Sequence, residues 1–246
     1  KRYPWTDDKR SVEALPECVS TSTLLLERAR QGAPSGALLV ADRQTAGRGR
    51  RGRSWLSSPA GSLTFSLLWR FACPVARLAG LSLAVGVAVA RALEASGVAG
   101  IELKWPNDIL LDGGKVGGIL IELEATPGSM LAVIGIGLNL QLPATGDEEM
   151  LHPPAALAQA LSPVPDRHQL LAQLLIDLAT VLDDFAESGF AAVRDDWQAR
   201  HAWQGRYVRL LNGGLVDREG KCLGADTDGA LLLHTAAGIE RCLSGD

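Results

Sequence analysis

The chain has 246 residues, 47% of them hydrophobic and 21% charged, and its formal net charge is −4. This length and composition exclude a globally disordered chain and predict one large domain, or a domain with a small appendage, around a buried core. The four cysteines and four histidines are scattered without C-x-x-C or metal-ligand spacing. Because no signal-peptide pattern is present either, we expect a cytoplasmic protein rather than a secreted, disulfide-bonded or zinc-binding one.

The first predicted element is a helix that begins in the hydroxyl-rich run 20–23 and ends near Gly32. Serine and threonine are favoured N-cap residues, and capping needs only one of these four hydroxyls. The others are free to hydrogen-bond a polar ligand. An apolar strand is predicted at 37–41, and it leads directly into a segment at 43–55 that is rich in arginine and glycine.

The segment 43–55 is interpreted as a loop shaped to hold anions. Glycine permits a positive φ and a close approach of the backbone to a ligand, and each guanidinium offers paired donors for carboxylate or phosphate oxygens. Because the whole chain is acidic, this positive charge is a local feature. Four arginines fall within six residues and are interspersed with glycines: Gly47, Arg48, Gly49, Arg50, Arg51, Gly52 and Arg53.

Three other interpretations of this loop compete with an anion site. The glycine spacing matches the dinucleotide fingerprint, but no helix start follows and no acid lies at 65–76, which disfavours a Rossmann site. A nucleic-acid patch is disfavoured by the few neighbouring aromatics and the acidic chain. A solvated flexible loop is the third alternative. The position between two apolar strands, with Trp55 at the end, favours a site.

A strand of alternating polarity at 62–70 and an alanine-rich helix at about 76–96 follow the loop. The apolar run in this helix lasts about a dozen residues before Arg91, whereas a membrane span needs about 20. We therefore expect a helix buried against a sheet, and no membrane partner.

A hairpin is predicted from strands at 101–111 and 115–124, joined by a turn at 113–114. The run Lys104-Trp-Pro-Asn-Asp108 interrupts its first strand, since proline cannot donate to a ladder. An ordinary strand-to-turn junction is the alternative to a site here. Lys115 would project from the partner strand, where Gly117 and Gly118 indicate close approach by a ligand. A nearly apolar strand at 130–140 is predicted to be central.

The remainder of the chain is predicted to change from helices to short strands. Residues 141–165 contain five prolines and predict a connecting loop with one short helix. Apolar residues at helical spacing predict a helix at 166–188 and a further one within 190–201. From Tyr207, turns at 212–214, 219–220 and 228–229 predict a small antiparallel barrel or sandwich. We place the boundary near Gly205, which gives domains 1–204 and 205–246.

The sequence shows no Ser-His-Asp, Cys-His or paired-carboxylate arrangement. Adenylation of a carboxylate needs none of them, because the substrate carboxylate itself attacks the α-phosphate and the enzyme supplies positioning and charge stabilisation. Arginine and lysine are suited to both tasks. A lysine such as Lys115 beside a carboxylate and a phosphate would neutralise both during acyl-phosphate chemistry.

Three motifs, Gly47–Trp55, Lys104–Asp108 and Lys115–Leu120, resemble in order and spacing the bacterial type of biotin protein ligase. Ser20–Thr21, Gln44 and Gly135–Asn139 fit the same family. The resemblance is strong over about residues 18–140 and looser through 224–233. It implies an α+β catalytic domain, with a mixed or antiparallel sheet flanked by helices as in class II synthetases, and a C-terminal SH3-like barrel.

The resemblance also implies two reactions. Biotin and ATP, with Mg²⁺, give biotinyl-5′-AMP, and a lysine of a biotin carboxyl carrier domain such as that of acetyl-CoA carboxylase then attacks it. Arg48 and Lys115 are the implied catalytic residues. The residues implied to bind biotin are Ser20, Thr21, Ser22, Gln44, Gly47, Arg48, Gly49, Arg50, Lys115, Gly117 and Gly118. Those implied to bind ATP or the adenylate are Arg50, Arg51, Arg53, Trp55, Asn107, Lys115 and Asn139, with Asp108 as a candidate to place the metal.

Regulatory members of the family carry a winged helix-turn-helix before the catalytic domain. Only 19 residues precede Ser20 here, whereas three helices of average length need roughly 35. We therefore expect no DNA-binding module and no DNA partner, and the sequence leaves a homodimer open. A lipoate ligase or octanoyltransferase is the alternative enzyme, but these relatives lack the arginine–glycine run.

Overall fold

The structure is a computed structural model that describes residues 12–143 and 153–246. Its centre is a seven-stranded sheet with the order β1-β2-β3-β7-β6-β5-β4. The pairing of β1 with β2 is parallel, and the other neighbouring strands in this sheet pair antiparallel. The strands are β1 (Val12–Cys18), β2 (Leu38–Gln44), β3 (Ser62–Phe71), β4 (Ile101–Lys104), β5 (Asp108–Leu111), β6 (Gly114–Thr126) and β7 (Ser129–Asn139).

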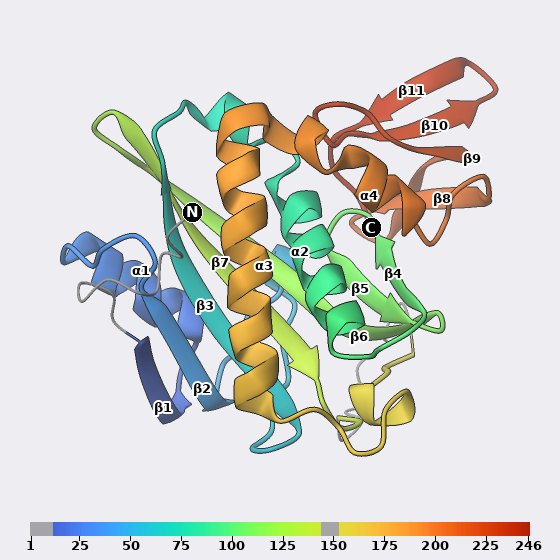
Figure 1. Ribbon diagram of the computed structural model, residues 1–246. Coiled ribbons are helices and arrows are strands. Elements are labelled where there is room, and N and C mark those ends of the chain that lie inside the picture. The colour runs from blue at the N-terminus through green and yellow to red at the C-terminus, as the bar shows by residue number, and fades with distance from the viewer. Residues whose placement is uncertain (1–11, 144–152) are drawn as a thin grey trace.

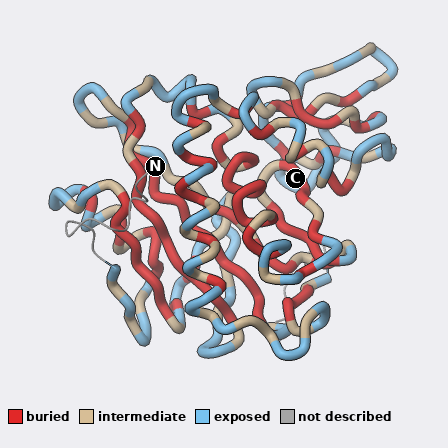
Figure 2. Tube along the Cα trace, in the orientation of Figure 1, coloured by how far each residue is buried: buried red, intermediate tan, exposed pale blue. Residues whose placement is uncertain are grey.

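Helices cover both faces of this sheet (Figure 1). On one face, α1 (Thr21–Arg30) packs against β2, β3 and β7. On the other, α2 (Leu81–Ala95) and α3 (Arg167–Ser188) pack against each other and on the strands. β3 serves both layers, because Phe65 belongs to the large α2–α3 core and Leu68 to the smaller core beneath α1. Buried residues accordingly run along β2, β3, β7 and α2 (Figure 2).

The apolar helix is used as a core element. The stretch Val75–Ala95 is long and apolar enough to cross a membrane, but 67% of its most apolar window is buried inside the protein. α2 packs on α3, β4 and β6, and the short 3₁₀ turn Val75–Leu78 precedes it. A helix that is apolar all round is expected where protein surrounds it.

The face of the sheet beneath α1 changes from large to small side chains along its strands. On β7, Leu131 and Val133 pack under α1, whereas the next positions on the same face are Gly135 and Gly137. On β3 the corresponding residues change from Leu68 to serine and threonine. The sheet therefore supports α1 at one end and leaves a hollow beside it at the other.

A second sheet, with the order β11-β10-β9-β8, follows the helices. The backbones of Leu211 and Asp246 exchange two hydrogen bonds, N–H to O at 3.1 and 3.0 Å, so residue 246 pairs with β8 on the side opposite β9. The Trp105 indole Nε1 donates to the Gly229 carbonyl at 3.0 Å, which attaches this second sheet to the seven-stranded sheet. The strands are β8 (Tyr207–Asn212), β9 (Leu215–Ala225), β10 (Leu231–Thr235) and β11 (Gly238–Cys242).

Most predicted elements are confirmed, including the helix N-cap at Ser20 and the central position of β7. The predicted hairpin is present, but its turn lies at 112–113, one residue earlier than expected, and the expected strand 101–111 is divided into β4 and β5, which pair antiparallel. Three further expectations were wrong. The first element is not the helix that begins within 20–23, because residues 12–18 form β1, an edge strand in which Pro16 is tolerated. Glu219 and Gly220 lie inside β9 and make no turn. β3, expected from its alternating polarity to be half-buried, is buried along almost its whole length.

The predicted helix at 190–201 is divided into the 3₁₀ turn Gly189–Ala192 and α4 (Arg194–Ala199). The loop predicted at 141–165 contains a 3₁₀ turn at Leu157–Gln159, and its residues 144–152 lie outside the described residues. The domain boundary near Gly205 stays a prediction, although β8 begins two residues after it, at Tyr207.

Candidate functional site

A cavity of about 650 Å³ opens on the α1 side of the sheet. Its floor is formed by β3, β6 and β7. Its walls are completed by residues 48–53, called the arginine–glycine turn here, and by residues of the second sheet. The cavity brings together most of the residues predicted for the site: Ser20, Thr21, Ser22, Gln44, Arg48, Gly49, Arg50, Arg51, Arg53, Trp55, Asn107, Asp108, Lys115, Gly118 and Asn139.

One end of the cavity is a cluster of hydroxyl and amide groups. Gln44 Oε1 accepts hydrogen bonds from the Thr21 backbone N at 2.6 Å and from Thr21 Oγ1 at 3.0 Å. Ser66 Oγ donates to Thr21 Oγ1 at 2.8 Å and lies 3.0 Å from Ser22 Oγ. A Cβ on Gly135 would lie 2.5 Å from Ser22 Oγ, so glycine is required for this close packing. These buried groups have fixed positions, which suits recognition of a small polar ring.

The middle of the cavity floor is covered by the Trp55 indole. A Cβ on Gly137 would lie 2.6 Å from Trp55 Nε1, so the indole rests on bare backbone there. Trp55 Nε1 and Thr64 Oγ1 are both buried and have no hydrogen-bond partner among the described residues. A buried polar group without a partner costs about 1–3 kcal/mol. The middle of the cavity therefore contains two buried polar atoms whose hydrogen-bonding capacity is unused by the residues that the structure describes.

The other end of the cavity holds an ionic group centred on Asp108. Asp108 Oδ1 lies 2.6 Å from Lys115 Nζ, and Asp108 Oδ2 lies 3.5 Å from Lys104 Nζ. Burial raises the pKa of Asp108, but Lys115 and Lys104 more than offset it, so the pKa lies below its usual range and the carboxylate is ionised. Burial lowers the pKa of Lys104, which Asp108 offsets only in part. Asp108 therefore holds the ammonium of Lys115 at the cavity wall.

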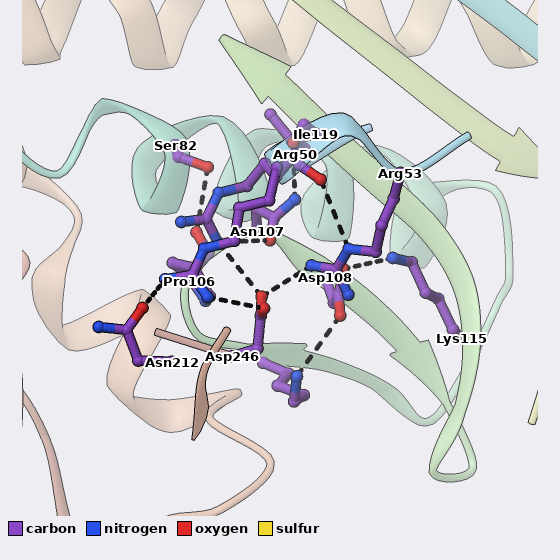
Figure 3. A network of polar contacts seen from close by, with 12 residues as sticks. Arg50, Arg53, Ser82, Pro106, Asn107, Asp108, Lys115, Ile119, Asn212 and Asp246 are labelled. Atoms are coloured by element: carbon purple, nitrogen blue, oxygen red, sulfur yellow. Dashed lines mark hydrogen bonds and ion pairs between the residues drawn. The ribbon is translucent and has the colours of Figure 1, made fainter. Parts of the chain in front are cut away.

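Three arginines of the turn converge on one carboxylate from the second sheet (Figure 3). Asp246 Oδ1 lies 2.7 Å from Arg53 Nη2 and 3.8 Å from Arg50 Nη1, and Asp246 Oδ2 lies 3.2 Å from Arg51 Nη1. Arg51 takes a left-handed conformation with φ +54°. Arg51 Nη2 also donates to Asn212 Oδ1 at 3.2 Å. The turn is therefore held in shape by the second sheet.

The turn is also connected to the Asp108 group. Arg50 Nη1 donates to Asn107 Oδ1 at 3.3 Å, and Asn107 Nδ2 donates to the Ile119 carbonyl at 2.8 Å (Figure 3). Burial lowers the pKa of Arg50, and Asp246 partly offsets it. Asn107 thus connects Arg50 to the strand that carries Lys115, and the cations predicted from separate segments share one end of the cavity.

Arg48 and Asn139 have structural contacts of their own. Arg48 Nη2 lies 2.7 Å from Glu122 Oε1, and Arg48 Nη1 donates to Thr23 Oγ1 at 3.1 Å. Asn139 Nδ2 donates to the carbonyls of Ala155 at 3.0 Å and Lys115 at 3.4 Å. Asn139 therefore fastens the backbone of Lys115 in place.

Two predicted ligand contacts lie off the cavity wall. Gly117 faces the opposite side of the sheet, where a Cβ would lie 2.6 Å from Leu138 Cδ2, so its glycine serves core packing. Gly47 packs against the turn itself, where a Cβ would lie 2.8 Å from Gln44 Nε2. Sequence reasoning missed Thr64, Ser66 and Asp246. The alternation of β3 already marked Thr64 and Ser66 as one face, whereas nothing in the sequence indicated Asp246.

The described residues do not form a metal site of their own. Within 12–143 and 153–246, no group of three or more histidine, cysteine, aspartate or glutamate residues is placed to hold a metal ion. Both oxygens of Asp108 face ammonium groups, which is a poor environment for a cation. The role of Asp108 in placing a metal therefore stays a prediction that this arrangement does not favour.

Comparison with known proteins gives concordant results. Residues 15–139 match the Biotin/lipoate A/B protein ligase family. The chain is 36% identical over 231 residues to the bifunctional ligase/repressor BirA of Bacillus subtilis, with coverage of 92% of this chain and 70% of that protein. It is 34% identical over 242 residues to the biotin--[acetyl-CoA-carboxylase] ligase of Mycobacterium tuberculosis, with coverage of 96% and 88%.

The fold comparison agrees with the sequence comparison. The solved structure of the biotin protein ligase from Aquifex aeolicus in complex with biotin and ATP superposes with a TM-score of 0.79 at 32% identity, and the match covers 96% of each chain. From its sequence relatives, its fold and the residues its cavity gathers, the chain belongs to the Biotin/lipoate A/B protein ligase family, as one of its biotin protein ligases.

Proposed function

We infer that this protein activates biotin with ATP to biotinyl-5′-AMP and transfers the biotinyl group to a lysine of an acceptor protein. The observation that carries this function is one cavity with two chemically different ends. A hydroxyl and amide cluster lies at one end, and Lys115 with the arginine turn lies at the other. Relatives named as biotin ligases, and a structural neighbour solved with biotin and ATP, support the same substrates.

The first reaction follows from the two ends. The buried hydroxyls and the Gln44 amide can both donate to and accept from a cyclic urea, which places the ring system of biotin among them. The carboxylate of biotin would then lie near Lys115, where its oxygen attacks the α-phosphorus of ATP and pyrophosphate leaves with the electrons of the broken P–O bond. Lys115, held by Asp108, lowers the energy of the developing charge, and the arginines of the turn hold phosphate oxygens.

In the second reaction the amine of the acceptor lysine attacks the acyl carbon of the adenylate. An amide bond forms, AMP leaves with the electrons of the C–O bond, and the amine loses a proton. We propose a biotin carboxyl carrier domain of acetyl-CoA carboxylase as the acceptor, as the names of the relatives indicate. Mg²⁺ is proposed to arrive bound to the ATP phosphates, and a cytoplasmic location completes the proposal.

The test is a biotinylation assay with the purified protein, ATP, Mg²⁺, biotin and a carrier domain. We expect the carrier to gain the mass of one biotinyl group, with no comparable transfer of lipoate. Lys115→Ala should lower adenylate formation by orders of magnitude, and Lys221→Ala, at an exposed position on β9, should leave it unchanged. Lack of transfer by the wild-type protein, or near-normal turnover by Lys115→Ala, would defeat the assignment.

A nucleic-acid role for the arginine turn is the competing interpretation. The turn is already engaged by carboxylates within the chain, through Asp246 and Glu122. We therefore expect no measurable binding of a DNA duplex at low salt, in a titration where charge-driven binding would be strongest.

A further inference from the structure

The cavity has three successive levels along paired strands. β3 pairs with β7 so that Ser66 faces Gly135, Thr64 faces Gly137 and Ser62 faces Asn139. Residues two apart on a strand are about 7 Å apart and point to the same side. Ser66 belongs to the hydroxyl cluster, and Asn139 contacts the backbone of Lys115. Thr64 therefore lies between the polar-ring end and the charged end.

Thr64 is the unused polar group of this middle level. Its residue is 3% exposed, it lines the cavity, and Oγ1 has no hydrogen-bond partner among the described residues. The nearby hydroxyls of Thr21, Ser22 and Ser66 are all hydrogen-bonded, so an unpaired hydroxyl is the exception on this face. A valine would fill the same space without the cost of burying an unpaired polar atom.

The group that covers Thr64 is the Trp55 indole, a side chain that a bound ligand can displace. The Trp55 indole lies on Gly137, the strand partner of Thr64, and its own Nε1 is also buried without a partner in the described part of the chain. Thr64 Oγ1 and Trp55 Nε1 are thus both shielded from water, and neither forms a hydrogen bond with the other. A ligand that moves the indole and offers an acceptor would relieve this condition.

We propose that Thr64 is a specificity-determining residue whose hydroxyl donates a hydrogen bond to the thioether sulfur of the bound biotin ring. The inference rests on the proposed function, because it uses the two ends assigned above. With the urea ring among the hydroxyls and the carboxylate near Lys115, the sulfur ring of biotin falls at the middle level. Thioether sulfur is a weak acceptor, and Thr64 Oγ1 has its donor free for it.

The test compares two ligands on three proteins by calorimetric titration: biotin and dethiobiotin, which lacks the sulfur, with wild type, Thr64→Val and Thr64→Ser. Thr64→Val should weaken biotin binding about threefold to tenfold, the range expected for losing one neutral hydrogen bond. It should change dethiobiotin binding less than twofold. Thr64→Ser should bind biotin within about twofold of wild type, because the hydroxyl is kept.

The controls separate this inference from folding and from the function itself. Unliganded Thr64→Val should melt at or above the wild-type temperature, since the substitution removes an unpaired buried hydroxyl. Unchanged biotin binding in Thr64→Val, or an equal loss for both ligands, overturns the role of Thr64 while leaving the ligase assignment intact. A wild-type protein that binds neither ligand overturns both.

Discussion

Replacing Asp108 by asparagine tests the ionic group at the cavity end. The substitution keeps the size of the side chain and removes the negative charge that lies 3.5 Å from Lys104 Nζ and 2.6 Å from Lys115 Nζ. At an effective dielectric constant of 20, a unit pair at 3.5 Å attracts by about 5 kcal/mol before solvation is counted. The Lys104 side chain is only 9% exposed. Removing the charge of Asp108 therefore leaves a buried ammonium without its partner, and breaking a buried ion pair in this way costs about 3–5 kcal/mol.

We expect a net loss near the lower end of that range, about 3 kcal/mol, because Lys104 can escape part of the penalty by giving up its proton. For a protein of this size, such a loss lowers the melting temperature by about 6–12 °C. Adenylate formation should fall as well, because Lys115 loses the carboxylate that positions it. Thermal melts and pyrophosphate release measure the two effects separately.

The double variant Lys104→Met with Asp108→Asn separates the two lysines. It removes the buried ammonium together with its partner, so most of the stability should return. Adenylate formation should stay low, because Lys115 still lacks its carboxylate. A single variant that melts within about 1 °C of wild type, or a double variant with restored activity, would refute this account of the ionic group.

Three further outcomes are expected. Asp246→Asn should speed trypsin cleavage within the arginine turn about fivefold to tenfold, because its two short, partly exposed ion pairs contribute about 1 kcal/mol or somewhat more. An unchanged cleavage rate would contradict the role of Asp246 in holding the turn in shape. Gly137→Ala should lower the unfolding free energy of the protein by about 1–3 kcal/mol in denaturant titration, since its Cβ would lie 2.6 Å from the Trp55 indole nitrogen. His201 is buried beside Trp197, and burial lowers its pKa to about 4, below the 6.5 of an unfolded histidine. The contribution of His201 to the unfolding free energy is therefore full above pH 6.5 and falls by about 3 kcal/mol toward pH 4. Denaturant titrations of His201→Phe at several pH values should lose this dependence of the unfolding free energy on pH.

Local signals in the sequence determined which elements were predictable. The N-cap at Ser20, the glycine-containing hairpin turn and the apolar spacing of α3 are each encoded within a few residues; the first and third are confirmed, and the turn lies one residue before its predicted position. Gly220 was mistaken for a turn because glycine is favoured there, whereas here it permits a close approach to the His234 backbone, which a Cβ would meet at 2.5 Å. β1 went unpredicted because none of its residues is buried, it contains Pro16, and its pairing with β2 is non-local.

The site shows the same division between local and non-local information. The arginines and Lys115 were visible as chemistry, and the structure brings them to one cavity. Alternation placed Thr64 and Ser66 on one face of a strand, but a period of two does not say which face meets a helix and which meets a cavity. Asp246 lies 193 residues from Arg53 in sequence, so their contact depends on how the second sheet docks.

The position of Asp246 explains how a turn with four arginines keeps a defined shape. Like charges in six residues repel, and one arginine takes a left-handed conformation, so the turn has little stability of its own. The structure provides a counter-charge from each side: Glu122 of β6 for Arg48, and Asp246 of the second sheet for the other three. The anion-binding turn therefore depends on both sheets, and the second sheet contributes to the site through charge without supplying any residue of the cavity floor.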